Sequence, residues 1–272
     1  MSEIKLREPD PDLIPLLRKC SSEELDNLVG YLTQKGGVSS QLKSTKPYRR
    51  WHPDHSKYVD EIIAEIQKYG GNTIFNIVRG GVGVTYRDIV LKVASRLKVK
   101  TVKGDPIDQV EQQILMKVLE KSWEKMNDTE KKTLIEGIMP ETGVGDLPKE
   151  FPTALLQAGI IAGGGIVSYK LSLIVAGAVA RASLERGITF IAGTSVARWS
   201  AAFAGAVGLG IAALWTLFDV LGPAYRVLIP CVLHIALLRQ LYALKESGVD
   251  PRKMPADAGH SARREILFRK FS

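Results

Sequence analysis

Apolar residues recur every three to four positions through much of the first 140 residues, the spacing of amphipathic helices. The clearest example begins after Asp105-Pro106, where Glu111, Lys117 and Glu124 fall on the side opposite the apolar residues. Those apolar residues are Ile107, Val110, Ile114, Leu115, Val118, Leu119 and Met126. No stretch alternates with a period of two, so the pattern predicts an all-α fold.

Three helix starts are marked by capping residues. Ser21 precedes Glu24 and Thr85 precedes Asp88 by three positions, the spacing of a capping box. Asn127 is a further N-cap candidate, before a helix expected to run to residue 138. These signals predict helices from about 22, 86 and 128 onward.

The stretch between the first two of these helices contains Pro53. Proline suits the first position of a helix, so we expect a helix from Pro53 to about residue 69. Residues 38–52 are polar and read as a loop, and the glycine-rich segment 80–83 reads as a tight turn.

The pattern changes after residue 150, where long stretches lack charge. Residues 151–169 are uncharged, and residues 171–180 continue apolar beyond Lys170. Residues 199–218 form a run of twenty without a charge, about the length that a helix needs to cross a bilayer. A further apolar helix is expected over 224–244, amphipathic and packed against the others.

Glycine and alanine dominate these apolar segments. Small residues recur every four positions in each, which lets helix backbones approach closely; they are Gly159, Gly163, Ala202, Ala206 and Gly210. Trp199 and Trp215 stand about 24 Å apart on a helix, a spacing that suits the two interfaces of a bilayer but equally suits core packing.

Three readings of the segments stay open. Residues 151–180 and 199–218 form a permanent transmembrane hairpin, or the buried core of a bundle that opens and inserts when triggered, or a soluble core that never meets lipid. The charges of Lys170 and Arg181 in the first segment and the low side-chain bulk favour the second over the first.

Charge is distributed unevenly along the chain. Residues 1–150 hold 24 Lys and Arg against 23 Asp and Glu, and residues 151–272 hold 13 against 6, out of a net charge of +8. Basic residues beside apolar helices suit anionic lipid, whereas a nearly neutral polar half disfavours nucleic acid as a partner. The tail carries Arg263, Arg264, Arg269 and Lys270 among apolar residues and is a candidate for lipid headgroups or a frayed basic end.

Candidate chemistry is sparse. Cys20 and Cys231 stand apart in apolar contexts and are expected to be buried, as is His234. His52 and His55 have no second pair of metal ligands nearby, so we expect no metal site. No nucleophile–base pair is recognisable, and no catalytic or cofactor-binding residue is assigned.

Several longer segments resemble the bacterial YaaW family. They are LIPLLRKCSSEELDNLVGYLT (13–33), YGGNTIFNIVRG (69–80), TYRDIVLKVASRLKVK (85–100), QVEQQILMKVLEKSWEKM (109–126) and AYRVLIPCVLHIALLRQL (224–241). The resemblance implies a helical fold with a middle portion similar to ubiquinol-cytochrome c chaperones. It brings no catalytic residues.

We therefore expect a polar helical interaction or sensing domain over 1–140, a linker over 141–150, an apolar helical membrane-competent domain over 151–246 and a basic tail over 247–272. The expected function is non-enzymatic: a membrane-inserting or membrane-perturbing effector of the bacterial cytoplasm and inner membrane, for example in stress or phage defence. The alternative is a chaperone that shields hydrophobic segments of a client, with residues 159–165 and 201–210 lining its groove. Expected partners are the lipid bilayer, a protein client and a second copy of the chain packed through the small residues.

Overall fold

The computed structural model describes residues 10–34, 40–71, 84–138, 165–191 and 222–253. Over these ranges the chain is helical and contains no strand, which confirms the all-α class. The α-helices are α1 (Ile14–Leu17), α2 (Ser22–Thr33), α3 (Lys46–Trp51), α4 (Val59–Gly70), α6 (Tyr86–Arg96), α7 (Ile107–Trp123), α8 (Asp128–Ile138), α10 (Gly165–Leu184) and α12 (Tyr225–Glu246). The short 3-10 helices are η1 (Leu42–Ser44), η2 (His55–Tyr58), η4 (Thr189–Ile191) and η5 (Pro251–Lys253).

The capping signals are confirmed. The Ser21 side chain accepts from the Glu24 N–H while the Glu24 carboxylate accepts from the Ser21 N–H, and Thr85 and Asp88 form the same box. Asn127 accepts from the N–H of Glu130 at 2.9 Å at the start of α8. Local hydrogen bonding thus sets these helix starts independently of the packing around them.

The expected helix from Pro53 is wrong. The chain forms η2 after Pro53, and α4 begins only at Val59. The expected loop over 38–52 instead contains η1 and α3, because Thr45 caps α3 by accepting from the Tyr48 N–H. Thr45 followed by Pro47 was a usable start signal for α3, since proline in the first turn gives up no helical hydrogen bond.

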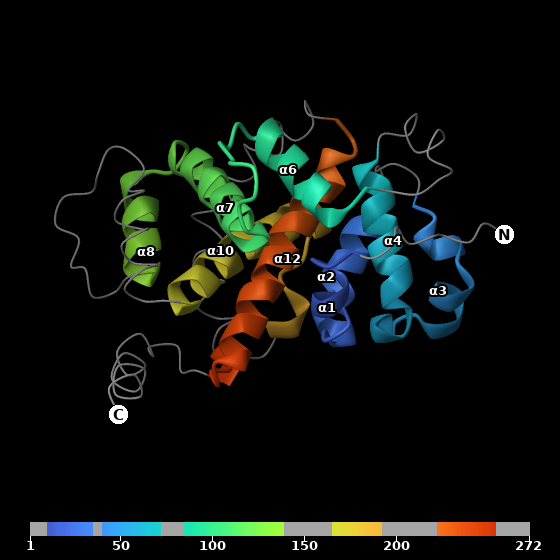
Figure 1. Cartoon of the computed structure of the whole chain (residues 1–272). Coiled ribbons are helices and arrows are strands. Elements are labelled where there is room, and N and C mark those ends of the chain that lie inside the picture. The colour runs from blue at the N-terminus through green and yellow to red at the C-terminus, as the bar shows by residue number, and fades with distance from the viewer. Residues whose placement is uncertain (1–9, 35–39, 72–83, 139–164, 192–221, 254–272) are drawn as a thin grey trace.

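Helix α12 runs through the centre of the bundle (Figure 1). It packs on α10 most extensively and also contacts α2, α4, α6 and α7. Every residue from Val227 to Leu238 is buried. The expected amphipathic face on this helix is therefore wrong: neighbours surround it, and a helix buried on all sides needs no polar stripe.

Helix α10 lies beside α12, with its first turn against the end of α12. A Cβ built on Gly165 would stand 3.0 Å from Leu244. Buried side chains of α10 and α12 join those of α2, α4, α6 and α7 in one hydrophobic cluster. Residues from both sides of the expected linker thus share an interior, while the linker itself lies outside the described residues.

Two glycines give a matched test of this packing. A Cβ on Gly70, at the end of α4, would come within 2.3 Å of Ile89 Cγ1 and 2.8 Å of Val84, whereas one on Gly177 in α10 meets nothing within 4 Å. We expect Gly70→Ala to lower the free energy of unfolding by about 1–3 kcal/mol through overpacking. Gly177→Ala should raise it by about 0.5–1 kcal/mol because alanine costs less backbone entropy in a helix. Urea unfolding followed by circular dichroism measures both, and equal effects at the two positions would contradict the packing of α4 on α6.

Candidate functional site: buried carboxylates around the central helix

Two of the described helices are long and apolar enough to cross a membrane, namely α10 and α12. Both are enclosed by protein here: 67% of the most apolar stretch of α10 is buried, and 78% of that of α12. The polar groups that hold α12 in this enclosure therefore form the site with the clearest bearing on function.

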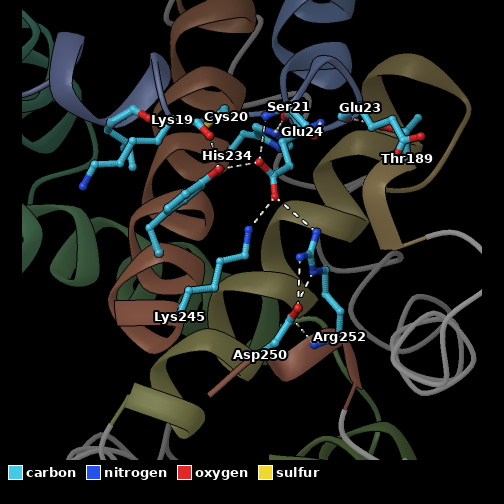
Figure 2. A network of polar contacts seen from close by, with 12 residues as sticks. Lys19, Cys20, Ser21, Glu23, Glu24, Thr189, His234, Lys245, Asp250 and Arg252 are labelled. Carbon is cyan, nitrogen blue, oxygen red and sulfur yellow. Dashed lines mark hydrogen bonds and ion pairs between the residues drawn. The ribbon is translucent and has the colours of Figure 1, made fainter. Parts of the chain in front are cut away.

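Glu24 of α2 is the first of these groups (Figure 2). Its side chain is 2% exposed. Oε1 accepts from Lys245 Nζ at 2.9 Å and from Arg252 Nη1 at 3.3 Å, while Oε2 accepts from the Tyr242 hydroxyl at 2.7 Å. One carboxylate thus ties the start of α2 to the end of α12 and to η5.

Contacts around Glu24 extend this junction. The Glu24 carbonyl lies 3.0 Å from His234 Nε2, and Asp250 holds the Arg252 guanidinium through two bonds of 3.0 Å. Thr189 donates to the Glu23 carbonyl at 3.1 Å and so links η4 to the same helix, as Figure 2 shows. His234 is buried as expected, with one ring nitrogen paired and Nδ1 without a protein partner.

Glu111 of α7 is the second group. Arg239 of α12 donates to Oε2 from Nε at 2.8 Å and to Oε1 from Nη2 at 3.2 Å, and Tyr86 donates to Oε1 at 2.7 Å. The Glu111 side chain is only 1% exposed, so its expected place on the solvent side of α7 is wrong. A bidentate, charge-assisted pair of this kind fixes the orientation of α12 against α6 and α7.

The two carboxyls differ in how readily they hold a charge. Burial alone would raise the pKa of Glu24, but hydrogen bonds from Lys245, the Ser21 N–H and Tyr242 outweigh it and hold this pKa below its ordinary value. Burial raises the pKa of Glu111 above its ordinary value, against the opposing pull of Arg239. Glu111 is the more deeply buried of the two, and its hydrogen bonds from Arg239 and Tyr86 do not offset the cost that burial adds to the charged form.

His55 occupies a third polar cluster, beneath α3. Its Nδ1 contacts the Tyr58 hydroxyl, its Nε2 lies 3.1 Å from Asp26, and Arg186 pairs with the same Asp26 at 2.9 Å. Burial lowers the pKa of His55, so the neutral ring is favoured. Among the described residues no group of three or more His, Cys, Asp or Glu is placed to hold a metal ion.

The residues singled out from the sequence for membrane packing lie outside the described residues. They are Gly159, Gly163, Trp199, Ala202, Ala206, Gly210 and Trp215, together with the basic tail residues Arg263, Arg264, Arg269 and Lys270. Their roles stay predictions. Cys20 and Cys231 are described, and both are buried and free as expected.

Sequence reasoning missed Glu111 as a buried group, although a signal was present. Arg239 stands in an otherwise apolar stretch, and a buried arginine needs a buried anion. Its partner is 128 residues away, so the signal predicts that a carboxylate exists without saying which.

The chain is similar to several bacterial proteins. A "UPF0174 protein" of Helicobacter pylori strain J99 is 34% identical over 233 residues, covering 85% of this chain and 91% of the relative. The "UPF0174 protein YaaW" of Escherichia coli K12 is 34% identical over 241 residues, covering 85% of this chain and 94% of the relative. Neither name states an activity. No family model and no solved structure matches the chain.

Proposed function

This chain belongs to the UPF0174 family, and we propose that it is a non-enzymatic bacterial protein that keeps membrane-competent helices inside a closed bundle and releases them into the inner membrane. The supporting observation is the enclosure of α10 and α12. Each is long enough to span the hydrocarbon core, at about 30 Å or more, yet most of its apolar stretch is buried against the other helix and against neighbours such as α2 and α7.

The buried ion pairs make the closed form the resting state. Moving α12 into lipid removes Arg239 from Glu111, and a charged arginine inside a membrane costs roughly 2.5–3.5 kcal/mol on insertion scales. Arg239 lies seven residues from the end of α12, about 10 Å along the axis, close enough for its side chain to reach a headgroup. The Arg239–Glu111 pair thus raises the free energy of opening the bundle, but the reach of Arg239 to a headgroup keeps that cost low enough for insertion to occur.

The two cysteines supply the test, because they should behave oppositely on insertion. Cys20 lies at the start of α2 and Cys231 within α12, and burial raises the pKa of Cys20 to about 12. We expect neither thiol to react with a membrane-impermeant maleimide in the closed protein. In the presence of phosphatidylglycerol vesicles, Cys20 should become reactive, while Cys231 should react only with a membrane-permeant reagent.

Single-cysteine chains carrying Cys20→Ala or Cys231→Ala separate the two signals. Arg239→Met should increase the inserted fraction, because it removes both the ion pair with Glu111 and the charge that lies farthest inside α12. Arg18→Met is the matched control, since Arg18 pairs with Asp60 at the exposed surface. Two results would overturn the proposal: both thiols staying unreactive with vesicles even in Arg239→Met, or both reacting with the impermeant reagent.

The alternative function, a chaperone, predicts a different result. Vesicles would then leave the reactivity of both thiols unchanged, and an apolar client helix would change it instead. The chaperone's groove was expected over residues 159–165 and 201–210, nearly all of which lie outside the described residues. The setting in stress or phage defence stays a hypothesis.

A further inference from the structure

The surface formed by η1, α3 and η2 carries cations that the fold does not use. Lys43, Lys46, Arg49, Arg50 and Lys57 are all exposed, and none forms an ion pair with a carboxylate in the described part of the chain. We call these five residues together with Trp51 the α3 patch. The five cations lie within fifteen residues of sequence, over three consecutive short helices.

Helix geometry brings three of these cations together. Lys46, Arg49 and Arg50 stand at positions i, i+3 and i+4 of α3, which places them on one face. Lys43 precedes them in η1, and Lys57 follows in η2. Helix α3 therefore presents three positive charges on one side.

Trp51 adds a large apolar ring to this face. It is 41% exposed, one of two large hydrophobic side chains exposed among the described residues. The Arg50 guanidinium lies 4.9 Å from the centre of its ring, a cation–π distance. An exposed tryptophan beside arginine and lysine suits the headgroup region of a membrane, where indole rings partition and basic residues meet anionic lipid.

The aromatic cluster beneath α3 holds the patch in place. Tyr48 packs edge-on against Tyr58 at 5.5 Å, and Tyr58 contacts His55, which in turn pairs with Asp26 of α2. The opposite side of α3 is thus fixed to the bundle while its cationic side faces outward. A fixed surface loses little conformational entropy on docking.

We propose that the α3 patch docks the protein on a membrane surface rich in anionic phospholipid headgroups. The bilayer as partner is taken from the proposed function. Docking on the surface and insertion are separate steps, so an experiment can refute either one and leave the other standing. A single-stranded nucleic acid is less well matched, because such binding sites stack successive bases on several aromatic rings along a groove. Here one exposed indole stands at the end of a short helix.

The test compares two triple variants that remove equal charge. Lys46→Gln, Arg49→Gln and Arg50→Gln remove the three cations of α3 from the patch, and Lys98→Gln, Lys100→Gln and Lys103→Gln neutralise an exposed basic stretch after α6. Binding is measured by co-sedimentation with vesicles of phosphatidylcholine alone and with added phosphatidylglycerol, at low and high salt. We expect wild type to bind only the anionic vesicles, and salt added before mixing to prevent the binding, since it screens the charges that dock the protein.

The patch variant should lose roughly 100-fold in affinity, from about fivefold for each cation near the surface. The control variant should change affinity much less. Wild-type fluorescence should shift to shorter wavelength on binding, and Trp51→Phe should reduce the shift while salt-sensitive binding persists.

Equal losses in the two triple variants would overturn the proposal, since only net charge would then matter. So would binding that ignores anionic lipid, or a patch variant that loses oligonucleotide binding while keeping its affinity for vesicles. Docking that leaves Cys20 as unreactive as in the closed protein would leave this inference standing and refute insertion. If the patch variant inserts as well as wild type, insertion stands and docking through the α3 patch is refuted.

Discussion

Glu111→Ala is expected to lower the free energy of unfolding by about 3–5 kcal/mol, the cost of leaving one member of a buried ion pair without its partner. Alanine leaves the buried Tyr86 hydroxyl without its acceptor and the half-buried Arg239 guanidinium without its carboxylate, with the Asp12 carbonyl as its remaining acceptor. Urea unfolding at neutral pH, followed by circular dichroism, measures the loss. Glu120→Ala on the same helix is the control, because Glu120 pairs with Lys117 nearer the surface and should cost less than about 1 kcal/mol.

A double variant separates the cost of a stranded charge from the value of the pair. Glu111→Leu combined with Arg239→Met removes both charges and keeps apolar volume, so most of the lost stability should return. A single variant that costs no more than the Glu120 control would contradict the burial of this pair. A double variant as unstable as the single one would show that Glu111 matters through its packing rather than its charge.

Glu24→Gln is expected to lower the free energy of unfolding by about 2–3 kcal/mol at neutral pH, because hydrogen bonds from Lys245 and Arg252 lose their charged acceptor. The size of this loss should depend on pH. The pKa of Glu24 is lower in the folded protein than its ordinary value of 4.5, so its ionised form stabilises the fold above pH 4.5. That contribution disappears as the pH falls through the folded value.

The difference in stability between wild type and Glu24→Gln should therefore shrink as the pH is lowered below 4.5. A series of urea titrations from pH 7 to pH 3 measures it. Glu111 acts in the opposite direction, since its raised pKa means that the folded state binds a proton more readily than the unfolded chain. Because both proteins retain Glu111, its effect cancels in the difference, and a difference independent of pH would contradict the charged state of Glu24.

Local signals were readable in the sequence wherever the physics was local. The capping boxes at Ser21 and Thr85 depend on residues three positions apart, and both helices begin where these boxes predict. The start of α4 was misplaced because Pro53 is compatible with a helix start without requiring one. The capping threonine of α3 outweighed the polar composition that suggested a loop.

The site depended on information that no local pattern carries. Glu24 was recognised as a capping residue, but its contacts with Lys245 and Arg252 span more than 200 residues of chain. The sequence pattern predicted Glu111 to face solvent because its helix has a polar side. That side is buried at Glu111 because α12 packs there and places Arg239 against the carboxylate. The α3 patch was missed for the converse reason: exposure of Trp51 follows from which face of α3 packs on Tyr58.

The central position of α12 also bears on how the chain folds during synthesis. Helices α2, α4, α6 and α7 leave the ribosome before the residues that fill the space between them, and the interval from the end of α7 to the end of α12 lasts on the order of ten seconds at ordinary translation rates. During that time the parts of their apolar faces that α12 covers have no native partner. The bundle therefore closes around α12 late in synthesis, and an interruption of translation between residues 123 and 225 leaves helices α2, α4, α6 and α7 without the helix that covers their shared interior.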